Sequence, residues 1–261
     1  MAEPTICVDV DDRGELGRVV RITVDHTAMF NILNTALIEK LTAAIESFHE
    51  DQVSRVMILT GAGSQAFIGG VDMKEMMGLD PASAEAFIAS LHGACAAIRS
   101  LPVPVIARIS GYCLGGGLEV AASCDLRVAS EDSTFGMPEV NVGIPSVIEA
   151  ALLPRLVGWG KARELVYTGL SISAAEALRC GLVERVVARE NLDRAVEEWV
   201  EAIINAGPRA TRLQKALIRQ WEILPVDRAV EEGIKAFGRA YQTDEPRMFM
   251  ERFLERKRDK E

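Results

Sequence analysis

A run of three glycines leads directly into an apolar segment that carries one acid. The stretch reads YCLGGGLEVAASCD, residues 112–125, with Gly115, Gly116 and Gly117 just before Glu119. Glycines before a helix let the backbone approach a ligand, and the free N–H groups at a helix N-terminus attract negative charge. A tight turn with close helix–strand packing would need the same glycines, so the run alone fits both interpretations.

The acid in this segment favours a functional site. The helix dipole stabilises an acid in the first turn, but a capping acid is usually exposed, and Glu119 stands between Leu118 and Val120. A carboxylate in apolar surroundings tends to have a raised pKa, as a proton-transfer catalyst needs. A second acid, Glu139, lies in FGMPEVNVGIP, residues 135–145. It is either a solvated loop residue or a partner, because two carboxylates around one cavity can divide acid and base roles.

Small residues after the expected strand RVMILT match a dinucleotide-binding fingerprint. Gly61, Gly63 and Ala66 fit its relaxed form. That fingerprint requires a helix immediately afterwards, and the glycine pair that follows disfavours one, so a strand-to-loop turn is preferred. P-loop, G-x-S-x-G and H-E-x-x-H patterns do not occur, and the three histidines lie far apart in the sequence. Serine-hydrolase and metal chemistry therefore have no support, and we expect no metal.

Composition and charge limit the remaining classes. The 261 residues are 49% hydrophobic, which is enough for one large domain or two small ones. The formal net charge of −9 argues against general nucleic-acid binding. Five scattered cysteines, never in Cys-x-x-Cys, are typical of a reducing, cytoplasmic location. The sequence shows neither a signal peptide nor an apolar run that could span a membrane, so no membrane association is expected.

Strands and helices alternate until about residue 190, and helices alone follow. Helix starts are expected at Asn34 and at Asp80-Pro81, where capping residues stand. The expected strands are Ile6–Val10, Arg18–Val24, Arg55–Thr60, Val103–Ile109 and Leu126–Ala129. The expected later helices are Asp193–Asn205, Arg209–Ile223, Ala229–Tyr241 and Glu245–Lys257. This order predicts an α/β core over residues 1–190 and a helical region over residues 191–261 within the same functional unit.

Several segments occur together in an order that is characteristic of one family. They are AFIGGVDMKEM, PVPVIARISGYCLGGGLEVAASCDLRVAS and FGMPEVNVGIP, followed by GWGKARELVYTG and AAEALRCGLVERVV. From about Val19 to the last helix, the chain resembles the crotonase (enoyl-CoA hydratase/isomerase) superfamily. The resemblance implies an α/β spiral of ββα units with a helical C-terminal trimerisation region. It also implies an acyl-CoA substrate and a homotrimer or a dimer of trimers.

The family's shared device is an oxyanion hole made of two backbone N–H groups. By motif position these belong to Val71 and Gly116. Forming an enolate places negative charge on the thioester oxygen, and each preorganised donor stabilises it by about 3–4 kcal/mol. A backbone donor tolerates valine at position 71, whereas Gly116 has to be small for the thioester to come close. The resemblance places the following residues against the substrate or its CoA moiety: Gly69, Gly70, Asp72, Met73, Lys74 and Gly115.

The resemblance further implies a hydratase, because hydratases of this family carry both glutamates. Glu119 would hold and deprotonate the water that adds to C3 of a 2-enoyl-CoA, giving a 3-hydroxyacyl-CoA reversibly. Glu139 would help position that water and exchange the proton at C2. Coenzyme A is part of the substrate, so no separate cofactor is expected. The alternatives are another crotonase reaction (isomerisation, dehydration, hydrolysis or decarboxylation) and a catalytically silent CoA-binding or RNA-binding relative.

The sequence departs from the hydratase pattern after Gly143. Hydratases have a glycine-rich stretch there, and Ser146 replaces a glycine whose N–H helps to hold the water. The backbone donor survives this change, but the side chains reshape the acyl pocket. Glu149 would lie about one turn into a helix that starts near Ser146. It is either a third carboxylate facing the cavity or, as we prefer, an ordinary solvated helix residue.

Overall fold

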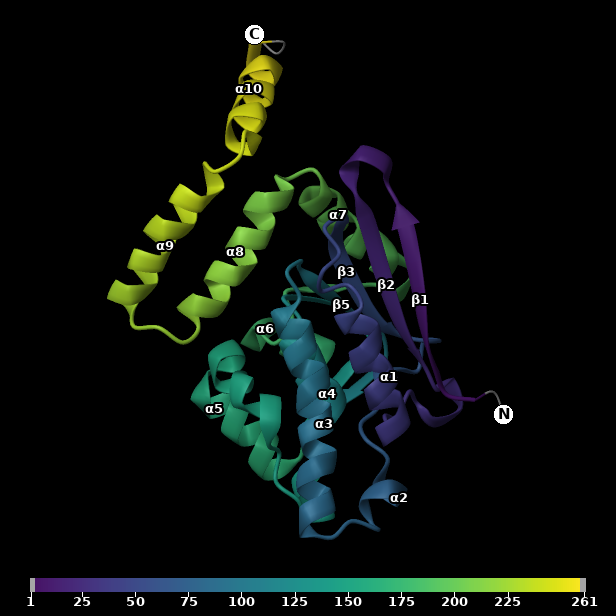
Figure 1. Cartoon of the computed structure of the whole chain (residues 1–261). Coiled ribbons are helices and arrows are strands. Elements are labelled where there is room, and N and C mark those ends of the chain that lie inside the picture. The colour runs from purple at the N-terminus through teal and green to yellow at the C-terminus, as the bar shows by residue number, and fades with distance from the viewer. Residues whose placement is uncertain (1–2, 259–261) are drawn as a thin grey trace.

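A computed structural model describes residues 3–258, and two β-sheets form the centre of this part of the chain (Figure 1). The larger sheet has the strand order β1-β2-β3-β5-β7-β10, and the smaller has the order β4-β6-β8-β9. The strands are β1 (Thr5–Asp12), β2 (Arg18–Asp25), β3 (Ser54–Gly61), β4 (Ala66–Ile68), β5 (Val105–Ile109), β6 (Tyr112–Leu114), β7 (Leu126–Ser130), β8 (Thr134–Gly136), β9 (Ile172–Ser173) and β10 (Arg185–Val187).

Helices surround these sheets and continue alone to the C-terminal side. The α-helices are α1 (Thr35–Glu46), α2 (Met73–Met76), α3 (Pro81–Ser100), α4 (Gly116–Ser123), α5 (Leu153–Thr168), α6 (Ala174–Cys180), α7 (Leu192–Ile204), α8 (Pro208–Trp221), α9 (Val226–Ala240) and α10 (Glu245–Arg258). Short 3₁₀ helices are η1 (Gly14–Leu16), η2 (Thr27–Met29), η3 (Pro138–Val142), η4 (Ile148–Leu152) and η5 (Arg189–Asn191).

Consecutive strand pairs wind between the two sheets as a spiral. In each turn the first strand joins the larger sheet and the second joins the smaller one, as in β3–β4, β5–β6 and β7–β8. Equivalent strands of successive turns pair in parallel, β3 with β5 and β5 with β7 in one sheet, β4 with β6 and β6 with β8 in the other. A helix follows each pair, so the expected α/β spiral of ββα units is confirmed.

Local sequence signals account for the positions of several elements. The Asn34 side chain accepts the N–H of Leu37 at the start of α1, and Asp80 accepts the N–H of Ser83 at the start of α3. Both expected caps are therefore confirmed. Strands β4, β6, β8, β9 and β10 are absent from the sequence prediction because each has only two or three residues, too few for a readable period.

The glycine-rich segment forms β6 and the central helix α4, all eight residues of which are buried. Gly117 packs directly against β4, where a side chain would collide with the backbone oxygen of Ile68. This glycine therefore serves close helix–strand packing, which was the structural alternative for the whole run. Gly116 and Gly115 lie one and two residues earlier, at the N-terminal end of α4, and Gly116 lines a cavity.

The C-terminal helices divide into one that packs on the sheet and others that extend away from it. The apolar face of α7, including Val196 and Val200, packs on a sheet face that includes Val56 and Ile106. Helices α8 and α9 lie side by side as an arm beyond the sheets, and α10 continues from it (Figure 1). The predicted boundary between residues 190 and 191 does not coincide with a break in packing, because α7 shares a hydrophobic core with the strands. This boundary remains a prediction.

Candidate active site

An apolar cavity of about 630 Å³ lies at the N-terminal end of α4. Its walls come from the loop after β4, from the first turns of α3, and from η3 with the loop that follows it. The lining residues are Val71, Met76, Leu79, Asp80, Pro81, Ala84, Glu85, Phe87, Ile88, Leu91, Gly116, Glu119, Glu139, Ile144, Pro145, Ser146 and Val147. Five of the sequence-predicted site residues are thus brought to one cavity: Val71, Gly116, Glu119, Glu139 and Ser146.

Glu119 is buried at the base of this cavity, with 4% of its surface exposed. The backbone N–H of Ala150 donates to its Oε1 at 2.9 Å. Burial raises the pKa of Glu119 to about 8; the Ala150 N–H acts in the opposite direction, and the Glu139 and Glu149 carboxylates raise the pKa. The expected buried acid with raised proton affinity is therefore present.

Glu139 comes from η3, and two neighbours fix its carboxylate. The hydroxyl of Ser146 donates to its Oε2 at 2.8 Å. Gly115, with φ +51°, lies against its Oε1, where a Cβ would collide with the carboxylate. Ser146, which replaces a glycine of the hydratase pattern, therefore has a role for its side chain: the hydroxyl orients the second acid.

Two backbone N–H groups next to the carboxylates have no internal acceptor. Val71 bridges to Leu33 in parallel register, but the hydrogen bonds run from Leu33 N–H to Gly70 and from Asp72 N–H to Leu33. Within residues 3–258, neither Val71 N–H nor Gly116 N–H donates a hydrogen bond to another residue. The two residues adjoin, since a Cβ on Gly116 would lie 3.1 Å from Val71 Cγ1. Free donors on one cavity wall can bind an anionic oxygen.

Apart from Val71, the residues of the loop from Gly69 to Lys74 do not line the cavity and form its rim. Backbone hydrogen bonds join the loop to the segment before α1, including Gly69 N–H to Phe30 at 2.9 Å. Asp72 caps the short helix α2 by accepting the N–H of Lys74. Met73 and Lys74 are exposed, and neither lines the cavity. Their expected contact with the CoA moiety remains a prediction.

Glu149 contradicts both expectations for it. It is buried, with 7% of its surface exposed, so it is not a solvated helix residue. It does not line the cavity either, because its carboxylate accepts from Nδ1 of His92 on α3, with Oε1 at 2.9 Å. The segment from Ser146 is also not yet an α-helix: 3₁₀ helix η4 begins at Ile148, and α5 begins at Leu153. Val147, with φ −125° and ψ −122°, is not helical, and Pro145 disfavours helical geometry at the residue before it.

Sequence reasoning missed two groups that belong to the site. The first is the face of α3 formed by Ala84, Phe87, Ile88 and Leu91, which supplies much of the apolar wall. Its i, i+3, i+4, i+7 spacing could have identified it, but such a stripe is normally read as core. The second is the N–H of Ala150, a backbone donor that no residue type reveals.

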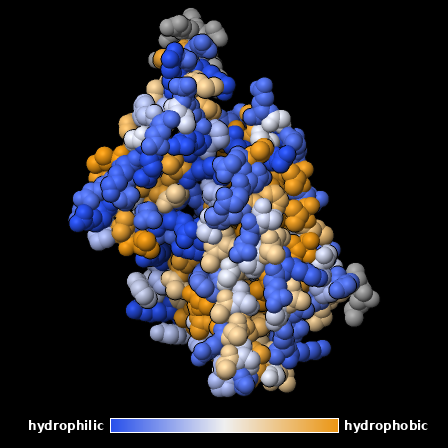
Figure 2. Space-filling view, in the orientation of Figure 1, coloured by the Kyte–Doolittle hydropathy of each residue, from blue (hydrophilic) through white to orange (hydrophobic). Residues whose placement is uncertain are grey.

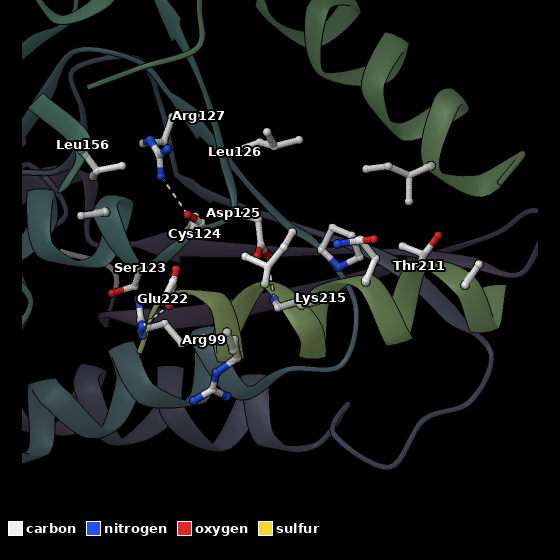
Figure 3. Close-up of a pocket in the computed structure, with 17 residues that line it drawn as sticks. Arg99, Ser123, Cys124, Asp125, Leu126, Arg127, Leu156, Thr211, Lys215 and Glu222 are labelled. Carbon is white, nitrogen blue, oxygen red and sulfur yellow. Dashed lines mark hydrogen bonds and ion pairs between the residues drawn. The ribbon is translucent and has the colours of Figure 1, made fainter. Parts of the chain in front are cut away.

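A second cavity, of about 590 Å³, lies where α8 meets the C-terminal end of α4 (Figure 3). Lys215 points toward Asp125, and Nζ lies 2.7 Å from Oδ2 (Figure 3). Nearby, Arg99 pairs with Glu222 at 2.7 Å. Burial lowers the pKa of Lys215, while Asp125 opposes the shift. These ion pairs attach α8 to the core, and the cavity contains none of the predicted site residues.

Three observations bear on other classes of function. Strand β3 is followed by β4 and not by a helix, so the dinucleotide fingerprint lacks its structural context. In the described part of the chain, 3–258, no helix combines the length and apolar character needed to cross a bilayer. Over the same residues, His, Cys, Asp and Glu side chains form no group of three suited to a metal ion.

Comparisons with known proteins place this geometry in a family context. A sequence model of the family described as enoyl-CoA hydratase/isomerase matches residues 15–260. The chain is 34% identical over 243 residues to a short-chain-enoyl-CoA hydratase of Clostridium acetobutylicum, covering 93% of each chain. It is 35% identical to a crotonyl-CoA hydratase of Syntrophomonas wolfei, covering 90% of this chain and 91% of the relative. A crystal structure of enoyl-CoA hydratase from Bacillus anthracis superimposes with a TM-score of 0.90 at 34% identity, covering 95% and 96%.

Proposed function

The chain belongs to the enoyl-CoA hydratase/isomerase family, and we propose that it is a hydro-lyase that adds water reversibly to 2-enoyl-CoA thioesters. One observation carries this proposal: Glu119 and Glu139 line a single apolar cavity beside Val71 and Gly116. Two carboxylates can share the two proton transfers of a hydration, and adjacent backbone donors can hold the thioester oxygen.

The proposed oxyanion hole consists of the N–H groups of Val71 and Gly116. When water oxygen adds to C3, electrons move through C2 to the thioester carbonyl and form an enolate. Each preorganised donor stabilises that oxygen by about 3–4 kcal/mol, because neither group has to reorganise. The absence of internal acceptors for these two N–H groups within residues 3–258 supports the assignment.

Glu119 is proposed as the base that removes a proton from the attacking water. A pKa of about 8 makes Glu119 a stronger base than an ordinary carboxylate, yet leaves part of it ionised near neutral pH. The rate of hydration should therefore rise with pH through this range, as Glu119 ionises. Glu139, oriented by Ser146, is proposed to position the water and to exchange the proton at C2.

The apolar wall is proposed to receive the acyl chain. Side chains of α3, including Phe87, Ile88 and Leu91, give this side of the cavity an apolar surface. We propose that the CoA moiety lies along the rim formed by Gly69 to Lys74, where Met73 and Lys74 are exposed. Coenzyme A belongs to the substrate, and the reaction proposed here uses no further cofactor and no metal.

We also propose that the chain forms a homotrimer or a dimer of trimers. Large apolar side chains gather on α9 and at the turn between α8 and α9 (Figure 2). They include Val226, Val230, Ile234 and Phe237, each more than half exposed. Such a patch is costly in water and typical of an interface. A cytoplasmic location stays a prediction from the cysteine pattern.

The proposal is tested by mixing the purified protein with 2-enoyl-CoA thioesters of short, medium and aromatic acyl groups. We expect loss of the conjugated-thioester absorbance with at least one of them, and a 3-hydroxyacyl-CoA as the product on chromatography. A shifted double bond, free coenzyme A or loss of carbon dioxide would identify a different reaction of the family. No turnover with any thioester would contradict the proposal.

A further inference from the structure

A second pair of titratable side chains joins η4 to α3 outside the cavity lining. Glu149 in η4 accepts hydrogen bonds from Nδ1 of His92 in α3, at 2.9 Å to Oε1 and 3.2 Å to Oε2. The Glu149 side chain is 9% exposed, whereas that of His92 is 56% exposed. Within residues 3–258, His92 is the only partner that donates hydrogen bonds to this carboxylate.

A buried carboxylate is costly unless something compensates for it. If the only task were to hold η4 against α3, an aliphatic side chain at this position could do it by packing. The location of Glu149 indicates a more specific task. Its neighbour in the chain is Ala150, whose N–H donates to Oε1 of Glu119 at 2.9 Å. One hydrogen-bonded path thus joins His92, η4 and Glu119.

We propose that Glu149 and His92 form a positioning pair that holds η4 so that the Ala150 N–H stays on the Glu119 carboxylate and the charge of Glu149 stays near it. The inference rests on the proposed function, because it assigns this pair to the acid that activates water. Neither residue lines the cavity, so both act through Glu119 and not on substrate.

The pair supplies two opposing influences on the proton affinity of Glu119. The Ala150 N–H favours the ionised form, and the negative charge of Glu149 favours the protonated form. The other titratable groups around Glu119 are Glu139 on η3 and the buried thiol of Cys95 on α3. Asp80, which caps the start of α3, and Glu85 in the first turns of α3 line the same cavity. Glu149 is therefore one of several acids, and its effect must be isolated by substitution.

The first test replaces Glu149 by glutamine and measures kcat/KM for hydration against pH. Glu149→Gln removes the charge but keeps an oxygen that can accept from His92. The limb of the profile that rises with ionisation of Glu119 should move to lower pH by at least a few tenths of a unit. Glu50→Gln is the matched control, because Glu50 faces His49 at 3.4 Å on the surface. An unshifted profile, or the same shift in the control, would overturn the proposal.

The second test changes the exposed partner, and circular dichroism checks that each variant is folded before its activity is compared. His92→Leu removes the donor to Glu149, whereas His92→Asn keeps an amide nitrogen near the position of Nδ1. We expect His92→Leu to lower kcat several-fold with little change in KM, and His92→Asn to restore most of it. Wild-type kcat in His92→Leu, or equal losses in both variants, would overturn the proposal even if Glu149→Gln fails to fold.

These outcomes are distinguishable from a failure of the proposed function. If Glu119→Gln keeps wild-type hydration, the role proposed for Glu119 is wrong, and the pair then has no catalytic group to position. If Glu119→Gln is inactive while the Glu149 and His92 variants match wild type in kcat and pH profile, only the positioning pair is wrong.

Discussion

At the scale of single residues, burial links the chemistry of Glu119 to the stability of the fold. The pKa of Glu119 rises from its ordinary 4.5 to about 8 in the folded protein. Between these values the folded chain keeps a proton that the unfolded chain has released. Stability from this group is thus complete below about pH 4.5 and is lost as the pH rises through about 8.

Glu119→Gln should therefore stabilise the protein at alkaline pH. The amide removes a buried charge, so we expect the free energy of unfolding to exceed that of wild type by up to roughly 5 kcal/mol at about pH 9. At about pH 5 the difference should nearly vanish, because Glu119 is then neutral in the folded state. Urea unfolding of the variant and of wild type at both pH values measures this difference in the free energy of unfolding. A difference that does not depend on pH would contradict the raised pKa.

Gly116 gives a second prediction at this scale. A methyl group there would lie 2.9 Å from Leu91 Cδ2 and 3.1 Å from Val71 Cγ1, so Gly116→Ala should displace the proposed donors. We expect kcat/KM for hydration to fall roughly 10–100-fold, the effect of a small misplacement at a reacting centre. Gly160→Ala is the control, because Gly160 has no heavy atom in reach of an added Cβ. Wild-type activity in Gly116→Ala would remove Gly116 from the oxyanion site.

The sequence predicted the two acids of the cavity but not the groups that hold them. Glu119 and Glu139 are 20 residues apart and stand in recognisable motifs. His92 and Glu149 are 57 residues apart and meet only because α3 packs against η4. Amphipathic spacing assigns a side chain to a face, but it does not name the partner on another element. Glu149 was therefore misread as solvated.

At the scale of elements, helix caps and strand-forming residues predicted the order of the longer helices and strands. The short strands and the 3₁₀ helices were not predicted. The helix expected from Ser146 is interrupted by η4, and a further break follows at Gly158, which has φ +75° within α5. These breaks matter for the site, because η4 carries Ala150 to Glu119. In a regular α-helix from Ser146, the N–H of Ala150 would donate to the carbonyl of Ser146 and not to Glu119.

The attachment of α8 gives a prediction for one element. Lys215 donates to the backbone oxygens of Val103 and Ile98, besides its ion pair with Asp125. Lys215→Met should lower the free energy of unfolding by roughly 3 kcal/mol, the low end for breaking a buried pair, since Asp125 is 30% exposed. Lys235→Met, which breaks an exposed pair with Glu232, should change it by less than about 1 kcal/mol. Equal effects in urea unfolding would contradict the anchoring role.

At the scale of the whole molecule, two exposed apolar surfaces within residues 3–258 bear on assembly. The apolar patch on α9 is one, and the exposed valines of β1, Val8 and Val10, are another (Figure 2). β1 alternates these valines with Asp9 and Asp11, which discourages further strand pairing. The α9 patch has no such protection, so it is the better candidate for subunit contact.

Light scattering after size-exclusion chromatography tests this assembly. We expect the mass of three or six chains for wild type. Ile234→Glu and Phe237→Glu place charges in the patch and should lower the mass, because a buried unpaired charge is unfavourable at an interface. Glu231→Gln, on an exposed face of the same helix, should leave the mass unchanged. A monomeric wild type, or patch variants of wild-type mass, would contradict the proposed interface.

The most direct test of the central claim measures the hydration rates of Glu119→Gln and Glu139→Gln. The substrate is an enoyl-CoA that the wild-type protein hydrates. Each variant should lose roughly 10²–10⁴-fold in kcat, the contribution of a positioned acid or base, while both stay folded. Ser146→Ala, which frees Glu139 without removing it, should lose less than either. Near wild-type hydration by Glu119→Gln or Glu139→Gln would contradict a mechanism in which the two carboxylates of this cavity add water.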